Sequence, residues 1–147
     1  MCEQCNYARL LKNADLEATA NRLHVMEVVG GNNCPLTAAE IFHTISRTQP
    51  INQVTVYRIL ELLVEQNLLE RITIGGRAAH YGMAPNEHHA PHPHFICTRC
   101  AAIDCLSPEC LSVDMENLRK TFSGEVERVE VRVEGICRNC LKGGGKK

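Results

Sequence analysis

The sequence has no tryptophan and contains only three phenylalanines and three tyrosines, so aliphatic side chains must fill most of any core. It has no apolar run of the roughly 18 residues that a membrane helix needs, and no signal-peptide stretch follows Met1. We therefore expect a cytoplasmic protein with no membrane partner. A chain of 147 residues is long enough for one large domain or two small ones.

An excess of charge of one sign is also missing. Sixteen lysines and arginines stand against 17 aspartates and glutamates, which gives a formal net charge of -1. This balance excludes a basic field over the whole protein, so any contact with nucleic acid has to be local. No G-x-S-x-G turn and no glycine-rich phosphate loop is present, and we expect no enzyme. A zinc metalloenzyme and a redox sensor stay open as alternatives.

Cysteine and histidine, by contrast, are abundant, with nine and seven residues. Nine cysteines cannot all pair within one chain. Without a secretory signal we expect a reducing compartment, which favours metal or redox chemistry over structural disulfides. The concentration of these residues therefore points to metal binding.

Residues 1–84 have the pattern of helices followed by a hairpin. The predicted helices lie at 7–14, at 20–29, after a capping box that starts at Thr37, and at 52–66. The predicted strands lie at 69–74 and 77–83, around Gly75-Gly76, which suits a tight turn. This order predicts a winged helix-turn-helix domain.

The fourth predicted helix has one apolar and one polar face. Its apolar arc consists of Val56, Ile59, Leu60, Leu63 and Val64. As a recognition helix it would offer Gln53, Thr55, Tyr57 and Arg58 to the major groove of DNA, with Arg77 of the hairpin on phosphate. The alternative is a helical core with a solvated polar face. Residues 1–84 hold seven Lys or Arg against eight Asp or Glu, so charge does not favour DNA.

Residues 85–91 carry two prolines around polar residues and predict a hinge. Beyond it, residues 92–147 form a second, metal-binding module. Its predicted elements are strands at 94–97, 102–105 and 126–133 and a helix at 113–121. A module of about 56 residues is small for independent stability, and dimers or metals usually supply what is missing.

Two Cys-x-x-Cys pairs are the strongest signal in the chain. They consist of Cys97, Cys100, Cys137 and Cys140. Each pair can hold one ion from a tight turn, and two pairs complete a closed tetrahedral zinc site. The alternatives are a redox pair or a disulfide. A shared structural zinc explains both pairs at once.

A second group lies around the hinge. His92 and His94 are two residues apart on an extended segment, so both imidazoles can reach one ion. Further candidate ligands are Cys105, His80 and Glu70. A solvated or packed residue is the alternative for each of them. Cys2 and Cys5 form a third Cys-x-x-Cys, for which an accessory metal site, a redox pair and no role all stay open. Cys34 and Cys110 are single, and we expect each to be a free, buried cysteine with no assigned role.

With these motifs in place, the chain resembles the ferric uptake regulator (Fur) family of bacterial metal-dependent repressors from about residue 14 to residue 140. The resemblance is carried by Thr-Ala-Asn-Arg-Leu at 19–23, Thr-Ala-Ala-Glu-Ile at 37–41, Thr-Val-Tyr-Arg-Ile-Leu at 55–60, His-Pro-His-Phe-Ile-Cys-Thr-Arg-Cys at 92–100 and Cys-Arg-Asn-Cys at 137–140.

The resemblance implies an α+β protein with an N-terminal winged helix-turn-helix domain and a small α/β dimerisation domain. It implies a structural zinc on four cysteines and a regulatory metal at the hinge. It further implies a homodimer that binds an A/T-rich palindrome when loaded with metal, and so represses metal-homeostasis genes. Tyr57 and Arg58 match the family's DNA-reading positions, and His92 and His94 match its regulatory ligands.

The chain departs from the family where iron- and peroxide-sensing members carry carboxylates. Gly82 follows Tyr81 at the end of the wing, and Cys105 replaces the carboxylate on the strand after the first Cys-x-x-Cys. Softer nitrogen and sulfur donors favour Zn²⁺ over Fe²⁺. We therefore predict a zinc-responsive regulator similar to the zinc uptake regulators. An iron(II)-, nickel- or peroxide-responsive regulator remains the alternative.

Overall fold

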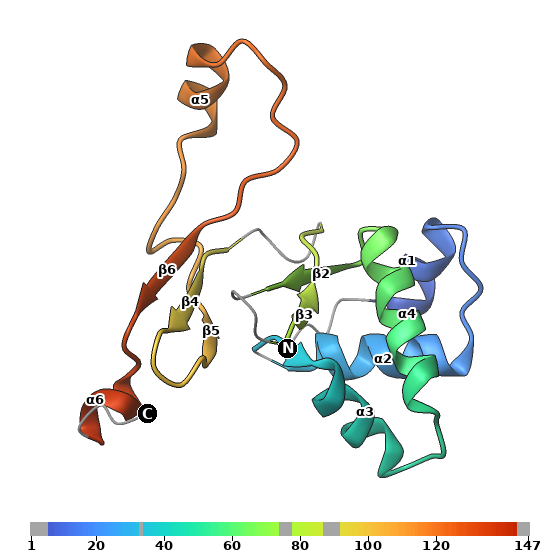
Figure 1. The fold of residues 1–147 in the computed structure, drawn as a ribbon. Coiled ribbons are helices and arrows are strands. Elements are labelled where there is room, and N and C mark those ends of the chain that lie inside the picture. Colours follow the sequence, from blue (N-terminus) through green and yellow to red (C-terminus); the bar gives the residue numbers. More distant parts are fainter. Residues whose placement is uncertain (1–5, 33, 74–77, 87–91, 144–147) are drawn as a thin grey trace. The chain divides into compact units, whose positions relative to one another are not determined.

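The computed structural model describes residues 6–32, 34–73, 78–86 and 92–143 (Figure 1). The chain divides into two compact units, Met1–Ala90 and Pro91–Lys147. The predicted hinge at 85–91 falls largely on residues outside the described ranges and stays a prediction. None of the helices in the described part of the chain is long and apolar enough to cross a membrane.

The first unit is built from capped helices. They are α1 (Tyr7–Asn13), α2 (Ala20–Gly30), α3 (Ala38–Ser46) and α4 (Gln53–Glu65). Thr37 and Glu40 form the predicted capping box at the start of α3, because the side chain of each accepts a hydrogen bond from the other's backbone N–H. The side chain of Asn52 accepts from the N–H of Val54 at 2.7 Å and starts α4. Local sequence signals therefore set where these helices begin.

The apolar arc of α4 enters a continuous aliphatic core. Val56, Leu60 and Leu63 are fully buried, and Ile59 is almost so. They pack with side chains of the other helices, which include Leu11, Val25, Met26, Ile41 and Ile45. The predicted arc is confirmed, except that Val64 is only partly buried. The opposite side of α4 is left at the surface.

A small antiparallel sheet completes the first unit. Its strands, in the order β1-β3-β2, are β1 (Leu36–Thr37), β3 (His80–Met83) and β2 (Leu69–Ile72). The two hairpin strands are shorter than predicted, and β1 was not predicted at all. Its two residues carry no periodicity, and only the non-local pairing of Leu36 with Tyr81 makes them a strand. Gly75-Gly76 and Arg77 lie outside the described residues.

The second unit contains a three-stranded sheet in the order β5-β4-β6. Its elements are β4 (His94–Cys97), β5 (Ile103–Cys105), α5 (Met115–Thr121), β6 (Arg132–Gly135) and α6 (Arg138–Lys142). β4 pairs antiparallel with β5 and parallel with β6. The helix α5 stands at the end of two long connections and buries no residue (Figure 1).

The strand predicted at 126–133 is wrong in its extent. The observed β6 starts at Arg132, which pairs with His94, the first residue of β4. The carbonyl oxygen of Val131 still accepts a hydrogen bond from the N–H of His94 at 3.1 Å, but residues 126–131 are not part of the strand. Val129 and Val131 nevertheless alternate with charges as a strand requires. The pattern indicated a half-buried strand but could not supply its partner.

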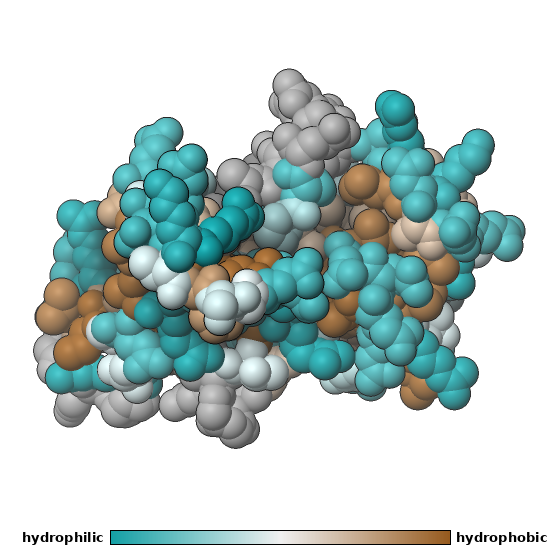
Figure 2. Space-filling view, turned by 90° about the horizontal axis from the view of Figure 1, so that it is seen from above, coloured by the Kyte–Doolittle hydropathy of each residue, from teal (hydrophilic) through white to brown (hydrophobic). Residues whose placement is uncertain are grey.

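Hydrophobic residues also reach the surface. The space-filling view shows brown hydrophobic areas at several separate places among teal hydrophilic residues (Figure 2). The large hydrophobic side chains that are exposed in the described residues are Val54, Tyr57, Leu111, Val113, Phe122 and Leu141. Single exposed side chains need no explanation, but groups of them mark contact surfaces.

Candidate metal centre

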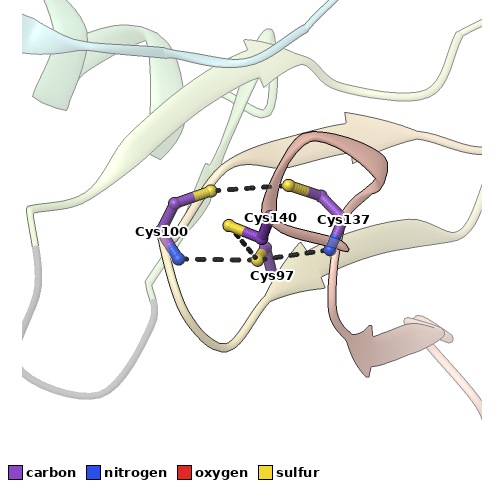
Figure 3. Close-up of side chains that lie close together, drawn as sticks. All are labelled: Cys97, Cys100, Cys137 and Cys140. Carbon is purple, nitrogen blue, oxygen red and sulfur yellow. Dashed lines mark hydrogen bonds between the residues drawn. The ribbon is translucent and has the colours of Figure 1, made fainter. Parts of the chain in front are cut away.

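Parallel pairing of β4 and β6 brings the two Cys-x-x-Cys pairs together. Cys97 ends β4 opposite Gly135, the last residue of β6. Cys100 lies in the turn after β4, and Cys137 and Cys140 lie at the start of α6 and within it. Figure 3 shows the four side chains converging, and their Sγ atoms all lie within 4.8 Å of one another. The short helix α6 was not predicted, although it carries the second pair.

The sulfur separations fit a tetrahedral zinc ion. The Sγ atoms of Cys97 and Cys140 are 3.8 Å apart, and those of Cys100 and Cys137 are 3.7 Å apart. Zn–S bonds of about 2.3 Å in a tetrahedron place sulfur atoms about 3.8 Å apart, whereas a disulfide needs about 2.05 Å. All four cysteines are free thiols. The geometry therefore matches the predicted structural zinc site rather than a disulfide.

The electrostatics of the four-cysteine group favour binding of a cation. The backbone N–H groups of Cys100 and Cys137 point at the Sγ of Cys97, at 3.4 and 3.3 Å, and lower the pKa of that thiol to about 5. Burial and hydrogen bonds with the neighbouring thiols raise the pKa of Cys140 to about 12. Four adjacent thiols cannot all ionise without a counter-charge. A bound divalent cation supplies it and selects the thiolate form.

The structure brings a second group together within the second unit. One donor atom from each of His92, His94 and Cys105 lies within 4.8 Å of the others. The antiparallel register of β4 and β5 places His94 directly opposite Cys105. The rings of His92 and His94 lie edge to face, with centroids 4.7 Å apart. Two nitrogens and one sulfur thus converge on one point.

The protonation state of His94 suits a ligand. Burial, and then the nearby His92, lower the pKa of His94 below its ordinary value of 6.5, while Glu130 opposes the shift. A neutral imidazole at pH 7 has a lone pair for a metal. Sequence reasoning missed Glu130, since nothing in an alternating charged stretch distinguishes one carboxylate from the next.

The other two candidate ligands lie in the first unit. Glu70 pairs with Gly82, and His80 pairs with Ile72, so the two side chains share one face of β2 and β3. Nδ1 of His80 lies 3.2 Å from the carbonyl oxygen of Ala78. Because a carbonyl only accepts, Nδ1 is the donor in this contact, which leaves Nε2 as the ring nitrogen that a metal could contact.

The predicted DNA-reading residues lie on the first half of α4. Gln53, Tyr57 and Arg58 are exposed, whereas Thr55 is half-buried. Arg77 lies outside the described residues. Val54 was not predicted and is 54% exposed. Cys34 and Cys110 are exposed, so the expectation that they are buried is wrong. Cys2 and Cys5 fall outside the described residues.

Comparisons with known proteins extend these findings. The model of the ferric uptake regulator family matches residues 13–134. The ferric uptake regulation protein of Bordetella parapertussis is 27% identical over 135 residues, which cover 90% of this chain and 95% of the relative.

Solved structures have the same fold. The peroxide stress regulator of Campylobacter jejuni has a TM-score of 0.68 and 28% identity, and the match covers 92% of this chain and 100% of that one. A zinc uptake regulator complexed with zinc and DNA has a TM-score of 0.60 and 20% identity, over 92% of this chain and 91% of that one. The predicted fold class, a winged helix-turn-helix domain followed by an α/β dimerisation domain, is confirmed. The chain belongs to the ferric uptake regulator family of metal-responsive transcriptional regulators.

Proposed function

We propose that this protein is a zinc-responsive repressor of metal-homeostasis genes, which binds its operator when a cation occupies the site at His92, His94 and Cys105. The convergence of these three donors carries the proposal. A set of two imidazoles and one thiolate suits Zn²⁺ better than Fe²⁺, which favours harder oxygen ligands. The relatives include ferric uptake, peroxide stress and zinc uptake regulators, so the choice of metal depends on this chain's own donor atoms.

Ligands from both sides of the hinge would couple the metal to DNA. We propose that Glu70 or His80 of the first unit adds a donor to those of the second. Without the cation, the DNA-binding domains of a dimer sample many separations. Ligation from both units restricts the separation to one that fits two half-sites on one face of the DNA. The coupling is reciprocal, so operator DNA tightens metal binding by the same factor.

The four-cysteine group has a structural role in this proposal. Cys97, Cys100, Cys137 and Cys140 would hold a zinc ion that joins the end of β4 to α6. Such a site is closed and leaves no open position for catalysis. The ion supplies only cross-linking, in a unit with few buried side chains.

The second unit also supports a homodimer. Leu111, Val113 and Phe122 are exposed around α5, and α5 buries no residue within the chain. Small units of this kind usually gain stability from a partner. Two identical chains would then present two recognition helices to an A/T-rich palindrome, as the family resemblance implies, in the cytoplasm.

The test is an anaerobic titration of Zn²⁺ and Fe²⁺ into the protein, each buffered by competitor chelators, with operator binding as the readout. We expect zinc to restore binding at the lower free concentration. If Fe²⁺ alone restores it at buffered cellular levels, the protein is an iron sensor. If oxidant abolishes binding while metal has no effect, it is a redox sensor.

One double variant distinguishes the histidine site from the four-cysteine site. His92→Ala together with His94→Ala should abolish the response to zinc but leave one zinc bound per chain. Loss of that remaining zinc, or of the fold, would show that the ligands are wrongly assigned.

A further inference from the structure

The first turn of α4 carries an apolar side chain that the core does not use. Among the large hydrophobic residues exposed in the described part of the first unit are Val54, at 54%, and Tyr57, at 45%. Asn52 caps the helix through the N–H of Val54, so Val54 lies in the first turn. The position is therefore fixed by a local hydrogen bond, not by packing.

Helical geometry places Val54 opposite the core. At about 100° per residue, Val54 lies about 180° from Leu63, whose side chain is fully buried. Tyr57 and Arg58 lie on either side of Val54 on the exposed face, one turn further along the helix. The three side chains form a small surface in which Val54 is the central, methyl-bearing member.

A valine at this position is unfavourable for the isolated helix. Its β-branched side chain loses rotamer freedom, so alanine would favour the helix more. It has no hydrogen-bonding group with which to contact phosphate or a base edge. Its two methyl groups can therefore only make apolar contacts with whatever approaches the exposed face.

We propose that Val54 reads the 5-methyl group of a thymine in the operator. This inference rests on the proposed function, in which α4 is the recognition helix. The first residues of such a helix contact base edges in the major groove. The thymine methyl is the apolar feature that the major groove presents, and it distinguishes thymine from cytosine at the same edge. Val54 is thus a specificity-determining residue beside Tyr57 and Arg58.

The test is a double-mutant cycle with metal-loaded, full-length protein and an operator selected from random DNA. Each thymine of the operator is replaced in turn by deoxyuridine, which pairs identically but lacks the methyl group. Wild type and Val54→Ala are measured against both DNAs at fixed salt. Glu65→Ala, at the exposed far end of α4, is the control for substitution on this helix.

We expect Val54→Ala to lose about tenfold in operator affinity, and deoxyuridine at the contacted thymine to cost wild type a similar factor. Val54→Ala should not respond to that deoxyuridine, because the methyl contact is already gone. Unchanged affinity of Val54→Ala, or additive losses at every thymine, would overturn the inference. If wild type selects no sequence at all with metal bound, the proposed function fails instead, and the two failures are told apart.

Discussion

The two units of this chain are stabilised in different ways. The first buries a continuous aliphatic core under capped helices. In the described residues of the second, the buried hydrophobic side chains are Ile96, Cys97 and Ile103, and Cys97 is one of the proposed zinc ligands. The first unit can therefore fold by burying apolar surface. We expect the second to depend on a bound metal and a partner chain, so that stability and metal sensing would lie in the same part of the chain.

Removal of the proposed structural zinc should have the largest effect, and it should disrupt the second unit while the first unit stays folded. Cys97→Ser takes away the thiol that lies against three backbone N–H groups. We expect loss of the tightly bound zinc and of dimerisation, while the helical circular dichroism of the first unit persists. Metal analysis measures the zinc content, and analytical ultracentrifugation measures dimerisation. Cys110→Ser is the matched control. A Cys97→Ser protein that keeps its zinc would show that the second unit does not depend on zinc held by these four cysteines.

Opening a cavity in the first unit should destabilise that unit and leave the zinc of the second unit in place. Leu60 is fully buried, and Leu60→Ala should lower the free energy of unfolding by about 2–5 kcal/mol. Chemical denaturation followed by circular dichroism measures this loss. Zinc bound by the four cysteines should be retained. Simultaneous release of that zinc would mean that the units do not fold independently.

Loss of one helix cap should be a smaller effect in the same unit. The Thr37 hydroxyl accepts from the N–H of Glu40 at 3.2 Å at the start of α3. Thr37→Ala should destabilise the first unit by about 1 kcal/mol, and Thr37→Ser should restore most of it. Denaturation midpoints of the two variants measure these changes in stability. Equal losses in both would show that the hydroxyl is not what matters.

The titration of His94 should give the smallest effect and should probe the second unit alone. Because burial and His92 lower its pKa below 6.5, its imidazole should stay neutral, and able to bind metal, to a lower pH than an ordinary histidine. Metal affinity should then fall only as the pH drops through this lowered pKa. NMR titration of the imidazole, with zinc on the four cysteines, gives the midpoint.

Two variants should move that midpoint in opposite directions. His92→Ala removes a neighbouring positive charge and should raise the pKa of His94. Glu130→Gln removes a negative charge and should lower it further. Shifts of the same sign in both variants would contradict this account of the second unit's electrostatics.

The sequence predicted local features better than non-local ones. The helix starts at Thr37 and Asn52 follow from side chains that bond to their own neighbours, and both were found. The strand β1 and the shortened β6 depend on which residues lie opposite, and no local pattern contains that information.

The sites divide in the same way. Cys-x-x-Cys spacing brings two thiols together within one turn, so both pairs could be recognised at once. That Cys105 lies opposite His94 follows from strand register, and a shift of one residue would have turned it to the other face. Sequence reasoning did not select Val54, because a valine in a helix is usually a core residue and only the structure shows that this one is exposed.

Metal bound by the histidines of the second unit should control DNA binding by the first unit. The most direct test of this control is operator affinity at fixed salt, with the four-cysteine zinc in place, with and without saturating additional zinc. We expect operator binding to be at least about tenfold tighter with the added zinc, which is a coupling of about 1.4 kcal/mol or more, and we expect no gain in the His92→Ala, His94→Ala protein. Equal affinity of the wild-type protein under both conditions would contradict it.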